Sequence, residues 1–140
     1  MIKDIVKDID ILSKKSEPFN FKSKEDKDLI TDMLDTAKVH EDRCVGLAAV
    51  QIGVHKRVIL VYNGERFVPM FNPRIIGTSG GTYTATEGCM SLDGFREVTR
   101  HLEVKVIYQD IKGKFKNEKY RGKMAQIIQH ECDHLEGVLI

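Results

Sequence analysis

Two histidines near the end of the chain, His130 and His134, have the type and spacing that metal chemistry needs. In a helix, positions i and i+4 lie on one face, with about 5–6 Å between their Cβ atoms. Both imidazoles can therefore reach one metal ion. Glu131 lies between them, where a carboxylate can contact a metal-bound water without binding the metal. The pattern His-Glu-x-x-His thus predicts a helix that carries a hydrolytic metal site.

The third metal ligand is expected upstream of this motif. Only residues 135–140 follow His134, and Glu136 is the one metal-binding type among them. Glu136 follows His134 by two positions and therefore points round the helix. The upstream and internal candidates are carboxylates together with Cys44, Cys89, Cys132, His40, His55 and His101.

The three cysteines differ in how well they suit this role. Cys132 lies about 200° round the helix from each motif histidine, so we expect it to pack as a small apolar residue. Gly88 precedes Cys89, and glycine lets the backbone approach a metal closely. Spacing alone favours Cys89 over Cys44, and a buried structural thiol is the alternative for either.

Three segments resemble the signature motifs of peptide deformylases. They are residues 46–51 (GLAAVQ), 87–91 (EGCMS) and 129–137 (QHECDHLEG), and they occur in the family's order. The resemblance extends from about Asp4 to the end of the chain. One such motif would be weak, whereas three in order are specific.

The resemblance implies a role for each matched residue. Cys89, His130 and His134 would hold a divalent metal, and Glu131 would be the general acid/base. The side chain of Gln51 and the backbone N–H of Met90 would stabilise the reacting oxygen. Losing one such donor typically lowers a rate by about 10²–10³.

Substrate binding is also implied by the resemblance. An apolar pocket would take an unbranched methionine side chain, and the substrate backbone would extend beside residues 45–46. Arg100 matches an arginine that the family uses near the substrate. The residues expected to bind substrate are Val45, Gly46, Glu87, Arg100 and Ile127.

The family removes the formyl group from the N-terminal formyl-methionine of new bacterial polypeptides, so the expected partner is such a polypeptide at the ribosome exit. The resemblance favours Fe²⁺ as the metal in the cell, with Zn²⁺ or Ni²⁺ in the purified protein. Ligand chemistry alone would favour Ni²⁺ or Zn²⁺ over Fe²⁺. Three protein ligands leave one coordination position open for water, as a catalytic site requires.

Three positions depart from the family's pattern. Cys44 stands where the first motif usually opens with glycine, and Asp93 where proline is common. Gln126 stands one turn before His130, where the family tends to carry an apolar residue near the methionine pocket. These departures leave the predicted ligands intact and concern the shape of the pocket.

Two alternatives follow from these features. One is a non-catalytic or altered-specificity metal-binding relative, against which the presence of Glu131 argues. The other is a different small HExxH metallohydrolase. Such an enzyme would take its third ligand from downstream of the motif, so the segment 87–89 argues against it.

Composition narrows the class further. A chain of 140 residues, 41% hydrophobic, is the size of one domain, so we expect residues 1–140 to form a single catalytic domain. A net charge of +1 gives no electrostatic reason to expect nucleic acid as a partner. No apolar run reaches the length of a signal peptide or a membrane span. Three cysteines without an export signal favour a cytoplasmic, reduced protein, which we expect to be a monomer or weak dimer.

Hydrophobic periodicity predicts the elements that position these residues. Residues 1–22 are expected to be irregular, and residues 24–40 to form an amphipathic helix that starts near Ser23 and Asp26. Residues 58–62 and 66–71 are expected to form a hairpin turning at Asn63-Gly64. Pro69 and Pro73 indicate an edge or a strand end.

The second half is expected to contain a loop, strands and a helix. Residues 78–86, with Gly80-Gly81, are expected to form a loop that leads into a strand before Cys89. A strand over 104–108 is expected to turn at 110–113 and return through 116–120. The last helix, about 122–136, would bury Ile127, Ile128, Cys132 and Leu135. The predicted class is α+β, with antiparallel strands packed around a central C-terminal helix that carries HExxH.

Overall fold

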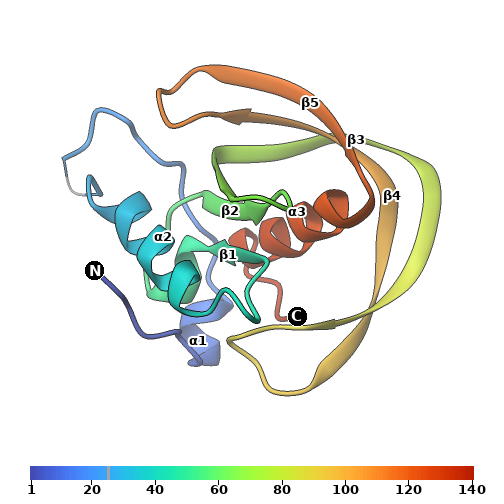
Figure 1. Ribbon diagram of the computed structural model, residues 1–140, viewed down its shortest axis with the longest axis horizontal. Coiled ribbons are helices and arrows are strands. Elements are labelled where there is room, and N and C mark those ends of the chain that lie inside the picture. Colours follow the sequence, from blue (N-terminus) through green and yellow to red (C-terminus); the bar gives the residue numbers. More distant parts are fainter. Residues whose placement is uncertain (25) are drawn as a thin grey trace.

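Residues 1–24 and 26–140 are described by a computed structural model, in which one antiparallel sheet carries most of the chain. The strands follow each other in the order β1-β2-β3-β4-β5, so each strand pairs with its neighbours in sequence (Figure 1). The elements are α1 (Ile9–Leu12), α2 (Leu29–Val39), β1 (Gly46–Ala48), the 3-10 helix η1 (Ala49–Ile52), β2 (Val58–Tyr62), β3 (Phe67–Gly88), β4 (Phe95–Gln109), β5 (Phe115–Arg121) and α3 (Gly122–Leu135).

The C-terminal helix α3 lies inside the curve of this sheet (Figure 1). It buries Ile127, Ile128 and Leu135 against side chains of the sheet, and Cys132, 9% exposed, joins the same cluster. The predicted class and the central place of this helix are therefore confirmed, as is the apolar packing of Cys132. Among the described helices, none is long and apolar enough to cross a membrane.

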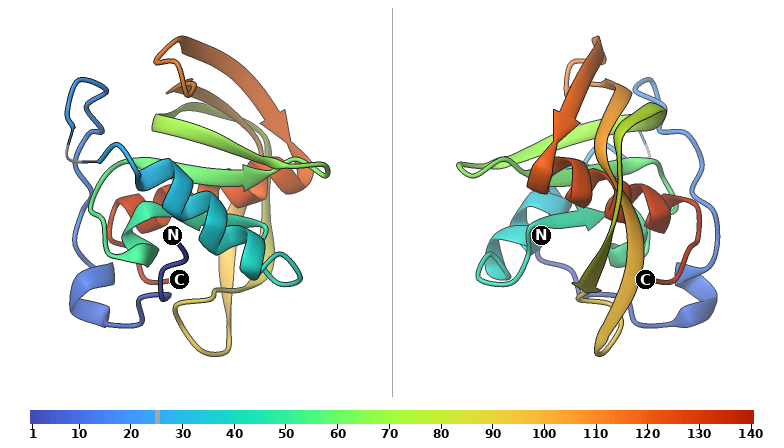
Figure 2. Two further views of the ribbon diagram at one scale, coloured as in Figure 1. Left: turned by 60° about the vertical axis from the view of Figure 1, so that its left-hand side comes forward. Right: turned by 90° about the vertical axis from the view of Figure 1, so that its right-hand side faces the viewer.

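Strand β2 separates two hydrophobic clusters. Ile59 and Val61 face the cluster that contains α3, whereas Val58 and Leu60 face the one that contains α2. Successive side chains of a strand point to opposite faces, so one five-residue strand serves both clusters. Figure 2 shows the result, with α2 and α3 on opposite sides of this part of the sheet.

The first half of the chain departs from the prediction at two places. The helix expected over 24–40 begins only at Leu29, whose N–H donates to the backbone oxygen of Asp26. Leu29 is the first buried residue of its apolar stripe, so nothing before it gains by continuing the helix; residue 25 lies outside the described part. Within the segment expected to be irregular, α1 forms one turn, capped by the Asp8 carboxylate and anchored by the buried Leu12.

The hairpin of β2 and β3 turns at Asn63-Gly64 as predicted, but β3 continues far beyond it. The loop expected over 78–86 is wrong, because β3 pairs with β4 as far as Gly88. The ladder shifts register between Ser79 and Thr82, where Gly80 and Gly81 have φ of +80° and +90°. A bulge therefore absorbs the two glycines that suggested a loop.

Two positions were expected for the prolines of β3, an edge or a strand end, and the strand end is wrong. Pro69 pairs with Leu60 of β2, and the ladder to β4 begins only at Phe71. Pro73 lies in the register shift that follows Phe71. Each proline thus stands where the ladder to β4 is absent or interrupted, so its missing N–H costs little.

Strand β5 and helix α3 agree with the prediction, whereas β4 begins at Phe95, nine residues before the predicted strand over 104–108. The turn between the strands is closed by Asp110, whose carboxylate accepts from the N–H groups of Lys112 and Lys114. The chain then passes from β5 directly into α3, so the position of the sheet determines where the histidine helix lies.

Gly137 ends α3 and provides a test of how the helix is held. Its φ is +77°, and the Val138 N–H donates to the Asp133 oxygen over 2.9 Å, which closes the helix end. A Cβ on Gly137 would also collide with the Ser13 carbonyl. We expect Gly137→Ala to lower the free energy of unfolding by about 2–4 kcal/mol, measured by urea denaturation.

Gly64→Ala is the matched control, because Gly64 has φ +99° and open space around it. The Gly64→Ala variant introduces only the strain of a left-handed backbone, so its free energy of unfolding should fall by about 1–2 kcal/mol. Equal losses in the two variants would show that the contact with Ser13 does not hold the helix end.

Candidate metal centre

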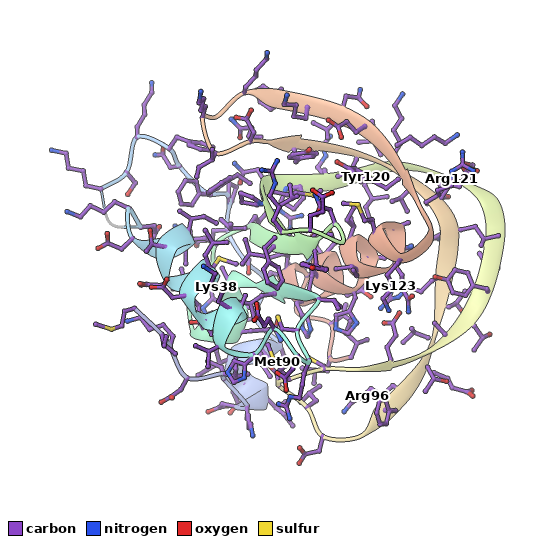
Figure 3. All side chains as sticks on the ribbon, viewed as in Figure 1. Lys38, Met90, Arg96, Tyr120, Arg121 and Lys123 are labelled. Atoms are coloured by element: carbon purple, nitrogen blue, oxygen red, sulfur yellow. The ribbon has the colours of Figure 1, made fainter. Side chains whose placement is uncertain are left out.

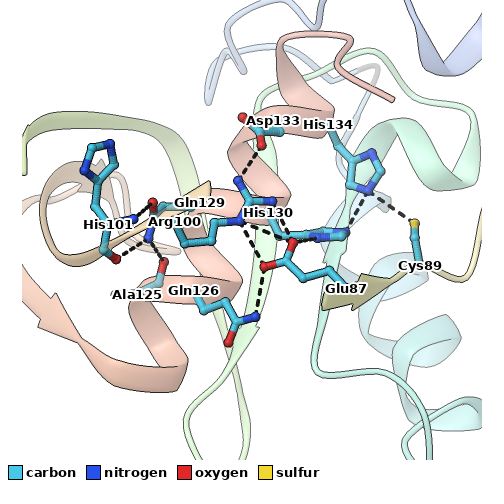
Figure 4. Close-up of polar contacts among 10 residues, drawn as sticks. All are labelled: Glu87, Cys89, Arg100, His101, Ala125, Gln126, Gln129, His130, Asp133 and His134. Atoms are coloured by element: carbon cyan, nitrogen blue, oxygen red, sulfur yellow. Dashed lines mark hydrogen bonds and ion pairs between the residues drawn. The ribbon is translucent and has the colours of Figure 1, made fainter. Parts of the chain in front are cut away.

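Helix α3 carries the pair His130 and His134, whose Nε2 atoms lie 3.2 Å apart. Cys89 follows the end of β3, and its Sγ lies 3.3 Å from His134 Nε2 (Figure 4). One donor atom from each of the three residues lies within 4.8 Å of the others. The structure thus brings together the three predicted ligands, two from one helix and one from a distant strand end.

These three atoms fit a divalent metal ion. With metal–nitrogen bonds of about 2.0–2.1 Å and a metal–sulfur bond of about 2.3 Å, tetrahedral ligands lie roughly 3.3–3.6 Å apart. The distances of 3.2 and 3.3 Å between the donor atoms match this spacing. A thiolate with two imidazoles is also a donor set that catalytic sites use while leaving a position open.

The buried carboxylate of Glu87 determines how His130 faces the site. Glu87 Oε1 lies 2.8 Å from His130 Nδ1, so Nδ1 carries the proton and Nε2 points toward Cys89 and His134. Burial alone would lower the pKa of His130, but hydrogen bonds with Cys89 and Glu87 raise it to about 10. Metal binding at this Nε2 therefore displaces a proton.

Glu87 is itself held by two further side chains. Arg100 donates to it from Nε and Nη2 at distances down to 2.7 Å, and Gln126 donates from Nε2 over 2.9 Å (Figure 4). Burial alone would raise the pKa of Glu87, but the hydrogen bonds from His130, Arg100 and Gln126 hold it well below its usual range. Glu87 is therefore an anion that orients His130.

Arg100 does not lie where the sequence suggested. It is 5% exposed, its Nη1 donates to Asp133 over 2.7 Å, and it is absent from the walls of the pocket. The expectation of a direct substrate contact is thus corrected, because Arg100 stands behind Glu87. Sequence reasoning missed Asp133 as its second partner, although Asp133 lies next to His134 in the motif.

Among the described residues, no such carboxylate stands behind His134. Its ring is buried, and within the described residues its Nδ1 has no hydrogen-bond partner. Burial, together with the charge on His130, lowers the pKa of His134 to about 3. This imidazole is therefore neutral, which is the state that binds a metal.

Glu131 lies on the pocket side of the ligands. It is 4% exposed, it lines the pocket, and its Oε1 has no hydrogen-bond partner among the described residues. Burial raises the pKa of Glu131 to about 7, although the charge on His130 acts in the opposite direction. A Cβ on Gly46 would lie only 2.7 Å from Glu131 Oε2 and 2.6 Å from Ile127 Cγ2. Glycine at position 46 therefore lets β1 approach α3.

Gln51 is held from both ends of its amide. Oε1 accepts from the Ala48 N–H over 3.0 Å, and Nε2 donates to Ser91 Oγ over 3.1 Å and to Cys89 Sγ over 3.4 Å. The amide nitrogen is therefore the end that faces the ligand group. Ser91, buried at 3% exposure, was not predicted, although its place two residues after Cys89 in the second motif would have indicated it.

A pocket of about 190 Å³ opens beside this group. Of the residues expected at the substrate, Val45, Gly46, Glu87, Met90 and Ile127 line it. Its other walls are Arg43, Cys44, Gln51, Thr86, Gly88, Cys89, Lys123, Gln126, His130 and Glu131. Of the three departures, Cys44 and Gln126 thus lie on the pocket, whereas Asp93 does not.

Cys44 is an inert part of this wall. Its thiol donates to the Gly46 oxygen over 3.2 Å, and burial raises the pKa of Cys44 to about 12. His40, His55 and His101 lie outside the group of candidate ligands, as expected for ordinary surface or core histidines.

Comparisons with known proteins agree with this geometry. A family model described as polypeptide deformylase matches residues 2–140. The peptide deformylase of Clostridium beijerinckii is 44% identical over 140 residues, which cover 100% of both chains.

Two solved structures show the same fold. The peptide deformylase of Thermotoga maritima superimposes with a TM-score of 0.89 at 34% identity, over 99% of this chain and 95% of that one. The Met-Ala-Ser-bound class I type b peptide deformylase of Acinetobacter baumannii gives a TM-score of 0.86 at 32% identity, over 99% and 96% of the two chains. The match along almost the whole sequence shows that this chain belongs to the polypeptide deformylase family, whose hydrolases remove the N-formyl group from newly made polypeptides.

Proposed function

We propose that Glu131 moves the protons of this deformylation while Cys89, His130 and His134 hold a divalent metal ion. The observation that carries the proposal is the convergence of Cys89 with the two histidines of α3, beside a buried carboxylate that lines the pocket. Held by these ligands, such an ion would supply Lewis acidity toward water and the formyl oxygen.

The reaction requires one proton to move from the attacking water to the departing nitrogen. A water oxygen bonds to the formyl carbon, the carbon–nitrogen bond breaks, and formate and a free amine leave. Glu131 accepts the proton from the attacking water and returns it to the departing nitrogen. Its position on the pocket wall, with one carboxylate oxygen free of other partners among the described residues, supports this role.

Charge on the formyl oxygen is stabilised by donors already in place. Gln51 contributes its side-chain amide, whose oxygen is tied to the Ala48 N–H so that its nitrogen faces the reacting group. The backbone N–H of Met90, next to Cys89 on the pocket wall, is the second donor. The Gln51 nitrogen donates to Ser91 Oγ and Cys89 Sγ in this structure, so one of these two hydrogens would turn to the formyl oxygen.

The substrate lies along the open edge of β1. Gly46 pairs with Val61 of β2 on one side, and the other edge of β1 borders the pocket. The first side chain enters between Val45 and Ile127, and the substrate backbone runs beside Gly46. Glu87 and Arg100 act indirectly, by positioning His130. The Met-Ala-Ser complex of the Acinetobacter baumannii relative supports a short peptide beginning with methionine as ligand.

The setting follows from the substrate. Residues 1–140 act as a single catalytic domain on formyl-methionyl polypeptides in the cytoplasm, as they leave the ribosome. The domain works as a monomer or weak dimer, needs no nucleic acid, and acts without a membrane. Three free thiols suit a reducing compartment.

Glu131→Gln tests the proton transfer. The amide keeps the size and hydrogen bonding of the side chain but cannot accept a proton, so formate release from formyl-Met-Ala-Ser should fall by about 10² or more. Metal content should stay the same, and an unformylated peptide serves as control for peptidase activity. Activity close to wild type in Glu131→Gln would contradict the mechanism, and cleavage of the control peptide would favour a different metallohydrolase.

The ligand set is tested by metal analysis of three purified variants. Cys89→Ala should lose most of its bound metal, because two imidazoles alone bind a divalent ion weakly. Cys44→Ala and Cys132→Ala are the matched controls and should retain metal, since both thiols are buried and protonated. Metal loss confined to Cys44→Ala would overturn the assignment.

We infer that the metal in the cell is Fe²⁺, with Zn²⁺ or Ni²⁺ able to occupy the purified protein. An iron site beside a thiolate is open to oxygen, and oxidation of Cys89 would destroy a ligand. Enzyme prepared without oxygen should therefore lose activity within minutes to hours in air, whereas the nickel-substituted form should persist. Equal and lasting activity of both forms in air would leave zinc as the better assignment.

A further inference from the structure

The wall of the pocket that α3 supplies carries two polar side chains besides those of His130 and Glu131. Ile127 is apolar, but Gln126 and Lys123 line the same pocket from the same helix. A methionine side chain has no group that needs two such hydrogen-bonding neighbours, because its thioether is only a weak acceptor. These polar side chains therefore call for an explanation in terms of what the pocket binds.

Gln126 is fixed in one orientation. Its Nε2 donates to Glu87 Oε2 over 2.9 Å, and Figure 4 shows its amide oxygen on the side away from Glu87. An amide nitrogen carries two hydrogens, and Glu87 takes one of them. In the described part of the chain this amide makes no other hydrogen bond, so its second N–H has no partner, and Gln126 is one of the residues that line the pocket.

Lys123 extends from the first turn of α3, three residues before Gln126 (Figure 3). Residues three apart lie on neighbouring positions of one helix face. Its ammonium group has no hydrogen-bond or ion-pair partner among the described residues, and it is exposed at the rim. Gln126 and Lys123 thus present donors at two depths of the same wall.

Methionine sulfoxide has the chemistry that these donors recognise. Oxidation keeps the length of the side chain but adds an oxygen to its sulfur, so a strong, polar acceptor takes the place of a weak one. A purely apolar pocket would leave that oxygen desolvated and unpaired, which lowers binding by about 10-fold or more. Because the formylated residue is methionine, its sulfoxide is the polar variant that this pocket can meet.

We propose that the pocket also accepts formyl-methionine sulfoxide, with Gln126 donating its free N–H to the sulfoxide oxygen and Lys123 assisting at the rim. Gln126 is then a specificity-determining residue. The inference rests on the proposed function, and the bond changes are those of ordinary deformylation: formate and a free amine form, and the sulfoxide is unchanged.

The test compares kcat/KM for three peptides: formyl-Met-Ala-Ser, its norleucine analogue, and its methionine sulfoxide analogue, with the two sulfoxide epimers assayed separately. In the wild type, at least one epimer should be processed within about 10-fold of formyl-Met. In Gln126→Ile, the ratio of sulfoxide to thioether should fall by a further 10-fold or more, while the ratio of norleucine to thioether changes little. Ratios within one preparation cancel any general effect of Gln126 on Glu87.

Two further variants keep the result decisive. Gln126→Met replaces the isoleucine variant if that protein does not fold, and Lys123→Met should lower the sulfoxide ratio less than either. An unchanged sulfoxide ratio in the Gln126 variants, or a larger loss in Lys123→Met, would overturn the assignment to Gln126. Turnover of formyl-Met with rejection of both epimers by the wild type would refute this inference alone, whereas failure to turn over formyl-Met would refute the proposed function.

Discussion

The buried carboxylate of Glu87 is the group on which the arrangement of the site depends. It stands at the end of β3 and is contacted by Arg100 of β4 and by Gln126 and His130 of α3. Burying such charges is expensive, so the network is weak evidence for stability. Removing Arg100, however, would leave the buried Glu87 carboxylate without its guanidinium partner. The network therefore acts by geometry, because it admits only one relative position of the three elements.

That position matters because the ligands come from separate parts of the chain. The two histidines need only a helix, but Cys89 must be delivered by a strand end, and β3 reaches that point through a long ladder with β4. Gly46 adds the second condition, since only a residue without a Cβ lets β1 lie against Glu131. The candidate ligands, Glu131 and the edge of β1 thus meet at a point that no single element defines.

This division explains what could be predicted from the sequence. Local patterns were sufficient for the hairpin at Asn63-Gly64, for α3, and for the apolar packing of Cys132. The length of β3 was missed because a glycine pair has the same local signal in a bulge and in a loop. Arg100 was predicted to contact the substrate because the sequence shows the type of a residue but not how deeply its side chain is buried. Its pairing with Glu87 depends on the β3–β4 register, which local patterns do not determine.

The same geometry links the wall of the pocket to the candidate metal ligands. Gln126 contacts Glu87 with one hydrogen of its amide and borders the pocket, while Glu87 orients His130. An apolar residue at position 126 would leave Glu87 with two partners and give it more freedom to turn, so the orientation of His130 would be less strictly held. The pocket wall and the metal ligand therefore cannot vary independently. A polar residue here holds Glu87 more firmly, and it also places a hydrogen-bonding side chain on the wall of the pocket.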